Sequence, residues 1–145
     1  MKVEREVDIK ASAEDLYEVI MDPQRLADWV TIHKKLEDAP DGMLHKGSTL
    51  TQCLKLAGST FKVRWKVVEN ERARRVVWEG RGPLRSKAKV IYEMQDTGAG
   101  NTHFTYLNEY DLPGGPLGRM AGPAVRKVTG GELDASLERL RKLVE

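Results

Sequence analysis

The sequence predicts an α+β protein in which one antiparallel sheet packs against a long C-terminal helix. Between Leu44 and Asp111 the chain alternates apolar and polar residues in short segments separated by tight turns. A strand and two short helices precede this region, and helix formers dominate after the turn cluster at residues 113–116. A helix that follows such strands buries its apolar stripe on their sheet. The expected order is one strand, two helices, six strands and a helix.

The first three elements are predicted from alternation and capping residues. Residues 2–10 alternate with period two, which indicates a strand with one buried face. Arg5 falls on the apolar face and could pair with a carboxylate of the fold or with an acidic ligand; we expect the first, or extension of the side chain toward solvent. Ser12 has the position of a helix N-cap, and Asp22-Pro23 can end that helix and begin another.

Six further strands are expected in the middle of the chain. Turn residues separate neighbouring strands by only a few positions, which is typical of hairpins in an antiparallel meander. The predicted strands are residues 30–37, 48–56, 60–69, 74–80, 86–95 and 102–111.

The C-terminal helix carries two apolar stripes that point in nearly opposite directions. The later stripe is formed by Leu133, Leu137, Leu140 and Val144, and the earlier one includes Met120, Ala124, Val125 and Val128. Between the stripes lie Gly130 and Gly131, which weaken a helix, and Thr129 with Glu132 has the spacing of a capping box. We therefore expect a kink near Gly130 or two helices in line.

Composition limits the class of protein. At 145 residues, with 32% charged and 40% hydrophobic residues, the chain fits one globular domain over residues 1–145. The net charge of +2 does not by itself indicate a nucleic-acid partner, and we expect no DNA contact. A single cysteine, Cys53, and the lack of a signal peptide or spanning segment favour the cytoplasm.

Alternation places large aromatic and amide side chains on the inner face of the sheet. This set can be a core that satisfies its few polar groups, or the lining of a mostly apolar pocket in which those groups orient a ligand. The candidate ligand-binding residues of the sheet are Gln52, Trp65, Trp78, Tyr92, Phe104, Tyr106 and Asn108.

Motifs for metal, cofactor or nucleophile chemistry do not occur. His33, His45 and His103 have no metal-ligand spacing, and no nucleophile elbow, phosphate loop or dinucleotide fingerprint is present. We therefore expect no metal and no cofactor. Basic residues on the outer sheet face are either a solvated surface or a docking site for RNA or an anionic membrane; they include Lys62, Arg64, Lys66, Arg75, Lys87 and Lys89.

The beginning and end of the chain resemble a known superfamily. The segment from Ile9 to Ile20 (IKASAEDLYEVI), followed by Asp22-Pro23 and LADW at residues 26–29, is similar to the opening of START-like (SRPBCC) polyketide cyclase/dehydrase and lipid-transport proteins. The ending LDASLERLRKL at residues 133–143 is similar to their closing helix. The resemblance implies the helix-grip fold, in which a curved seven-stranded sheet wraps a C-terminal helix around a cavity. It also implies that Trp29 lies near the cavity mouth, although Trp29 could equally be an anchor that docks the short helix. We add Met120 and Ala124 of the C-terminal helix as ligand contacts.

Three functions follow as hypotheses. The first is binding or transport of a hydrophobic small molecule, such as a lipid, polyketide or quinone-like compound, between sheet and C-terminal helix. The second is a cyclase/dehydrase-type enzyme in which Tyr92, Tyr106 or Asn108 polarises a carbonyl. The third is an interaction protein that uses the basic outer face. The sequence does not indicate the ligand, turnover or the oligomeric state.

Overall fold

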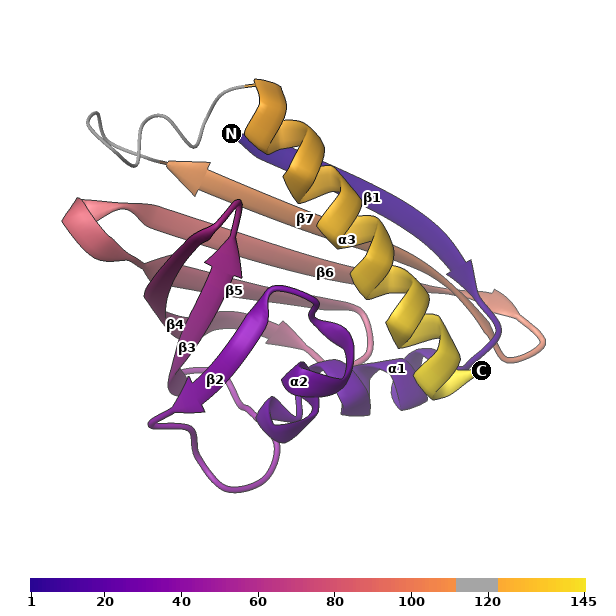
Figure 1. Ribbon diagram of the computed structural model, residues 1–145. Helices are drawn as coiled ribbons and strands as arrows, with labels where there is room; N and C mark the ends of the chain where they lie inside the picture. The colour runs from indigo at the N-terminus through magenta and orange to yellow at the C-terminus, as the bar shows by residue number, and fades with distance from the viewer. Residues whose placement is uncertain (112–122) are drawn as a thin grey trace.

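The computed structural model describes residues 1–111 and 123–145, which form an α+β structure with a curled sheet (Figure 1). Seven strands, all paired antiparallel, lie in the order β1-β7-β6-β5-β4-β3-β2. Their bounds are Lys2–Ile9 (β1), His33–Glu37 (β2), Thr49–Leu56 (β3), Ser59–Glu71 (β4), Arg75–Arg81 (β5), Lys87–Gly98 (β6) and Asn101–Asp111 (β7). The predicted antiparallel meander is confirmed, because β2 to β6 each pair with the next strand along the chain.

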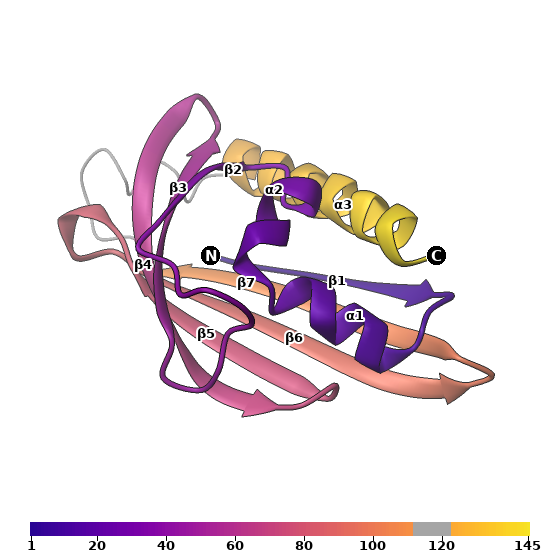
Figure 2. The same ribbon diagram turned by 90° about the horizontal axis from the view of Figure 1, so that it is seen from below.

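The helices lie on the concave face of the sheet, which curls around them (Figure 2). They are α1 (Ala13–Ile20), α2 (Leu26–Trp29), which follows a 3-10 turn at Pro23–Arg25, and α3 (Pro123–Val144). Helix α3 runs along β1 and contacts α2 (Figure 1). None of the helices in the described part of the chain is both long and apolar enough to cross a membrane.

Capping residues fix the beginning of both short helical segments. The Asp15 backbone N–H donates to Ser12 Oγ at 3.1 Å, and the Gln24 N–H donates to Asp22 Oδ1 at 3.0 Å. Each side chain satisfies a donor that the first turn of a helix leaves free. The predicted N-cap is confirmed, and so is the prediction that one helix ends before Asp22-Pro23 and another helical segment begins there.

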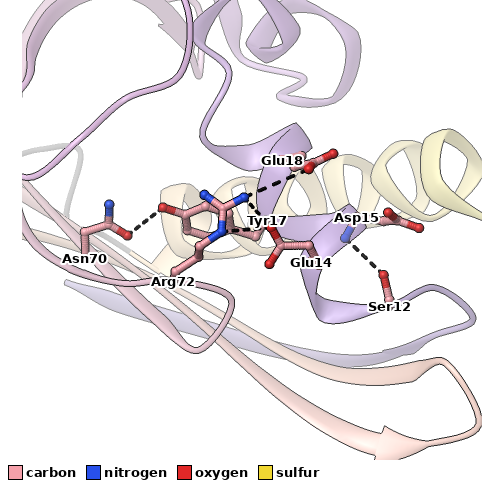
Figure 3. A network of polar contacts seen from close by, with 7 residues as sticks. All are labelled: Ser12, Glu14, Asp15, Tyr17, Glu18, Asn70 and Arg72. Atoms are coloured by element: carbon pink, nitrogen blue, oxygen red, sulfur yellow. Dashed lines mark hydrogen bonds and ion pairs between the residues drawn. The ribbon is translucent and has the colours of Figure 1, made fainter.

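Helix α1 is held against the β4–β5 hairpin by a polar network (Figure 3). Tyr17 Oη donates to Asn70 Oδ1 at 2.8 Å, and Arg72 Nε donates to Glu14 Oε1 at 2.8 Å. The Arg72 guanidinium also lies 4.9 Å from the centre of the Tyr17 ring and 4.0 Å from a carboxylate oxygen of Glu18. These contacts position α1, and the chain then continues into α2 at the centre of the concave face.

Helix α3 is continuous through Gly130 and Gly131 and runs without a sharp bend (Figure 1), so the expected kink or break is wrong. Its buried positions follow one helical face: Thr129, Gly130, Leu133, Ser136, Leu137 and Leu140. The earlier stripe does not compete for the sheet, because Ala124 is exposed, Val125 is half-buried and Val128 is 43% exposed. The capping box does not form either, since the Thr129 hydroxyl donates to the Val125 carbonyl within the helix at 2.8 Å.

Gly130 allows α3 to lie close to β1. A Cβ at this position would overlap Nη2 of Arg5 on β1, whereas a Cβ on Gly131 would meet nothing within 4 Å. Arg5 Nε donates to Asp134 Oδ1 at 2.9 Å, which confirms the expected carboxylate partner. The glycine therefore makes room for a side chain of β1 and does not bend the helix axis.

Candidate ligand-binding site

The inner face of the sheet and the α2–β2 corner enclose a small cavity. Its volume is about 20 Å³, room for a single water molecule. The sheet contributes Gln52, Leu54, Trp65, Trp78, Val90, Tyr92, Tyr106, Asn108 and Tyr110, and the opposite wall consists of Leu26, Val30 and Ile32. We expected a cavity against the C-terminal helix; no described residue of α3 lines this one.

Aromatic rings in edge-to-face contact form one side of this cavity. The Tyr92 ring centre lies 5.6 Å from Trp78, 5.3 Å from Tyr106 and 6.1 Å from Trp29, at interplanar angles of 60–84°. Phe104 stacks on Tyr92 at 6.1 Å. Such aromatic pairs stabilise the fold beyond the burial of their apolar area, and they fix the orientation of the rings. The strands therefore present a shaped aromatic surface to whatever occupies the cavity.

Three buried donors in this region have no protein partner among the described residues. They are Trp29 Nε1, Trp78 Nε1 and Asn108 Nδ2. Trp78 and Asn108 line the cavity, and Trp29 packs against two of its rings. An unsatisfied buried donor costs about 1–3 kcal/mol, so this site favours a guest with acceptor oxygens.

The tyrosines of the site are neutral and can donate hydrogen bonds. Burial raises the pKa of Tyr92, Tyr106 and Tyr110 above the ordinary value of a phenol. Tyr110 Oη donates to Asn108 Oδ1 at 3.3 Å. This bond uses the amide oxygen of Asn108 and leaves its N–H₂ group free. The amide is therefore a further hydrogen-bond donor in the cavity lining.

A hydrogen-bonded chain leads from the cavity to the edge of the sheet. Trp65 Nε1 donates to Gln52 Oε1 at 3.0 Å, which directs the Gln52 amide nitrogen toward His33 Nδ1 at 2.9 Å. Burial lowers the pKa of His33, and the neutral ring accepts this bond at Nδ1. No sequence pattern indicated a role for His33, since the pairing depends on which residues β2 and β3 bring together.

Helix α3 supports the site from behind the α2–β2 corner. The Thr31 backbone N–H donates to Ser136 Oγ at 3.0 Å, and the Thr31 hydroxyl donates to the Glu132 carboxylate. Thr31 lies between Val30 and Ile32, both of which line the cavity. Helix α3 is therefore hydrogen-bonded to the segment that forms the cavity wall opposite the sheet.

The structure brings most of the predicted site residues together. Six of them line the cavity: Gln52, Trp65, Trp78, Tyr92, Tyr106 and Asn108. Trp29 and Phe104 are fully buried in the same aromatic cluster, so Trp29 anchors α2 and does not lie at a mouth. Ala124 is exposed on α3, away from the cavity lining, and Met120 lies outside the described residues.

Several residues of the lining were absent from the predicted site. Tyr110 lies on the same inner face as Tyr106 and Asn108. The alternation of residues 102–111 could have added it to the predicted site. Leu26, Val30 and Ile32 are ordinary apolar residues whose role depends on where the short helix packs. In residues 1–111 and 123–145, no three His, Cys, Asp or Glu side chains are grouped to hold a metal ion.

The sequence matches a known protein family over its whole length. The sequence profile described as polyketide cyclase / dehydrase and lipid transport matches residues 1–145. The chain belongs to this family. An uncharacterized protein of Mycobacterium tuberculosis is 25% identical over 145 residues, covering 97% of this chain and 96% of its own. The helix-grip architecture is thus that of a polyketide cyclase/dehydrase and lipid-transport family member.

Solved structures share the fold at low identity. A protein of Thermus thermophilus matches with a TM-score of 0.80 and 18% identity, over 99% of this chain and 97% of that one. The Zhui aromatase/cyclase of a Streptomyces species matches with 0.75 and 17%, over 99% and 93%. A START superfamily protein of Mycobacterium smegmatis matches with 0.72 and 19%, over 99% and 96%. These similarities establish the fold of this family member.

Proposed function

We propose that the protein binds a hydrophobic small molecule with at least one acceptor oxygen and carries it in the cytoplasm. The observation that carries this proposal is the pair of buried, unpartnered donors, Trp78 Nε1 and Asn108 Nδ2, on residues that line an otherwise apolar cavity. A dry core would leave both donors unpaired at a cost of about 1–3 kcal/mol each. A carbonyl or hydroxyl oxygen of a lipid, polyketide or quinone-like guest would satisfy them.

Uptake of such a guest requires the cavity to enlarge. Pockets for drug-sized ligands measure about 300–1,000 Å³, whereas this cavity holds about 20 Å³. The strands of the sheet are paired along their length, so the movable wall is the corner formed by Val30 and Ile32. Ligand binding therefore involves displacement of this corner and of its hydrogen bonds to α3.

Titration with two fluorescent probes tests the proposal. Prodan carries a ketone oxygen on an aromatic ring system, whereas diphenylhexatriene is a hydrocarbon. Trp78→Phe keeps an aromatic ring and removes the N–H, so prodan should bind about fivefold more weakly while diphenylhexatriene changes little. Arg64→Ala on the outer face is the matched control and should alter neither affinity. Absence of probe binding, or equal effects of both substitutions, would contradict an internal site.

A cyclase/dehydrase-type activity is the second candidate. Its support is the neutral state of Tyr92, Tyr106 and Tyr110, whose raised pKa values suit donation of a hydrogen bond to a substrate carbonyl. The described lining contains no Asp, Glu, His, Lys or Arg that could act as a base. Binding without turnover is therefore favoured, and conversion of a poly-β-ketone by the purified protein would reverse this preference.

A further inference from the structure

The turn between β5 and β6 exposes a large apolar side chain at one end of the molecule. Leu84, in the 3-10 turn Pro83–Arg85, is 63% exposed, more than the other exposed large hydrophobic residues of the described chain, Val128 and Leu143. The turn projects beyond the sheet at the left of Figure 1. Single exposed leucines are common, so exposure of Leu84 does not by itself indicate a function. The backbone conformation and the charges near the turn add to it.

The backbone holds Leu84 in a conformation that favours other residues. Leu84 has φ +54° and Arg85 has φ +63°, in the left-handed region where glycine and asparagine are preferred. The turn is closed by two backbone bonds, Gly82 N–H to the Ser86 carbonyl at 3.0 Å and Ser86 N–H to the Pro83 carbonyl at 3.1 Å. Folding alone would be served better by asparagine than by an exposed leucine at this position.

Basic residues occur in this turn and on the neighbouring strand ends. Arg64, Arg81 and Lys87 form one row across β4, β5 and β6, and Arg85 lies in the turn itself. We call these four residues the tip cluster. All four are exposed, and none forms an ion pair with another described residue. Like charges opposite one another on neighbouring strands are unfavourable, so the cluster suits an anionic partner.

Nearby carboxylates limit the cluster to the tip. Asp111 lies opposite Lys87 in the register, and Glu79 and Glu109 lie one side-chain row further along the sheet. In that row Lys66, Glu79, Lys89 and Glu109 alternate in sign. Positive charge is therefore concentrated around Leu84 and does not extend over the whole outer face.

An apolar cleft of about 20 Å³ opens beside the turn. Its lining includes Leu56, Phe61, Val63 and Pro83, together with Tyr110. Tyr110 also lines the internal cavity, and Pro83 of the turn lines the cleft. Apolar residues therefore lie next to the exposed turn.

We propose that the β5–β6 turn docks the protein on an anionic lipid membrane, with Leu84 entering the acyl boundary and the tip cluster contacting lipid headgroups. An apolar side chain combined with lysines and arginines matches the chemistry of such an interface. Single-stranded RNA is disfavoured, because its bases stack on aromatic side chains, and none is among the exposed large hydrophobic residues of the described chain.

Vesicle co-sedimentation of the full chain tests this proposal. We expect binding to vesicles of phosphatidylcholine mixed with phosphatidylglycerol, little binding to pure phosphatidylcholine, and loss of binding at high salt. Leu84→Asn should weaken binding at least about tenfold, while its melting temperature stays equal or rises because asparagine suits the left-handed backbone. The double variant Arg81→Gln/Arg85→Gln should weaken binding about fivefold per charge removed.

Matched controls separate the tip from general surface effects. Leu143→Asn removes another exposed leucine, and Arg139→Gln removes an exposed arginine of α3; both should bind vesicles as the unchanged protein does. The proposal is overturned if the unchanged protein ignores anionic vesicles or if Leu84→Asn binds them equally well. Binding of an RNA oligomer through Arg81 and Arg85 without any contribution of Leu84 would also overturn it. The proposal stands independently of the ligand site, since vesicle binding needs no guest in the cavity.

Discussion

Replacement of Gly131 by alanine should stabilise the protein. The residue lies inside α3 on its exposed side, and an added Cβ would meet no atom within 4 Å. Alanine is favoured over glycine in a helix interior by about 0.8–1.0 kcal/mol. The entropy of unfolding, about 2.1 cal/mol/K per residue, amounts to roughly 0.3 kcal/mol/K for 145 residues. The melting temperature should therefore rise by about 3 °C.

Gly130→Ala is the matched control. It gives the same gain in helix propensity as Gly131→Ala, but it also disturbs a contact with β1. The new Cβ would displace the Arg5 guanidinium and disturb its 2.9 Å contact with Asp134. The two side chains are 40% and 60% exposed, so this ion pair contributes about 0–1 kcal/mol. Gain and loss nearly cancel, and the net change in stability should be close to zero.

Urea denaturation and thermal melting of both variants, with prodan titration, test this reasoning. Binding should be unchanged in both, because neither glycine lines the cavity. If Gly131→Ala failed to stabilise the protein, the assumption of an unstrained, solvent-facing position would be wrong. Weaker probe binding in either variant would instead restore the hypothesis that the glycine pair shapes the cavity.

Three further predictions concern other positions. Gly80→Ala should lower the free energy of unfolding by about 1–3 kcal/mol in urea denaturation, because its Cβ would lie 2.5 Å from Val63 and 2.7 Å from Trp65 in the core. His33 has a lowered pKa in the folded state, so its contribution to stability is present above pH 6.5 and is lost as pH falls; His33→Gln should remove this dependence. The hydrogen bond to Asp8 raises the pKa of His103, so its contribution is present below pH 6.5 and lost as pH rises; a His103→Gln variant that kept this slope in urea titrations would contradict the assignment.

The strands and their inner faces could be predicted because alternation alone determines them. Once residues 60–69 alternate, Trp65 must share a face with Val63 and Val67, and the register then sets it beside Gly80. The same argument places Tyr92 and Tyr106 opposite each other on the concave side. Local pattern was sufficient here, since a strand has only two faces.

The continuity of α3 and the position of the cavity were not predictable in the same way. Two glycines weaken a helix, yet α3 is continuous and buries Gly130 where a Cβ would overlap the guanidinium of Arg5, a residue far away in sequence. The wall made by Val30 and Ile32 depends on how a four-residue helix lies across the sheet. Neither contact leaves a periodic signal, so sequence patterns did not indicate that Val30 and Ile32 form this wall.

The order of strands has a consequence for synthesis of the protein. β1 is made first, but its partner is β7, with Lys2 opposite Glu109. The N-terminal strand therefore leaves the ribosome long before its neighbour exists, and its backbone groups stay unpaired while β2 to β6 form hairpins. Closing such a distant contact is slow, and an unpaired edge invites association with other chains. Nascent chains that end before β7 should expose the edge of β6 and an unpaired β1, in addition to the edge of β2, and so require protection by chaperones.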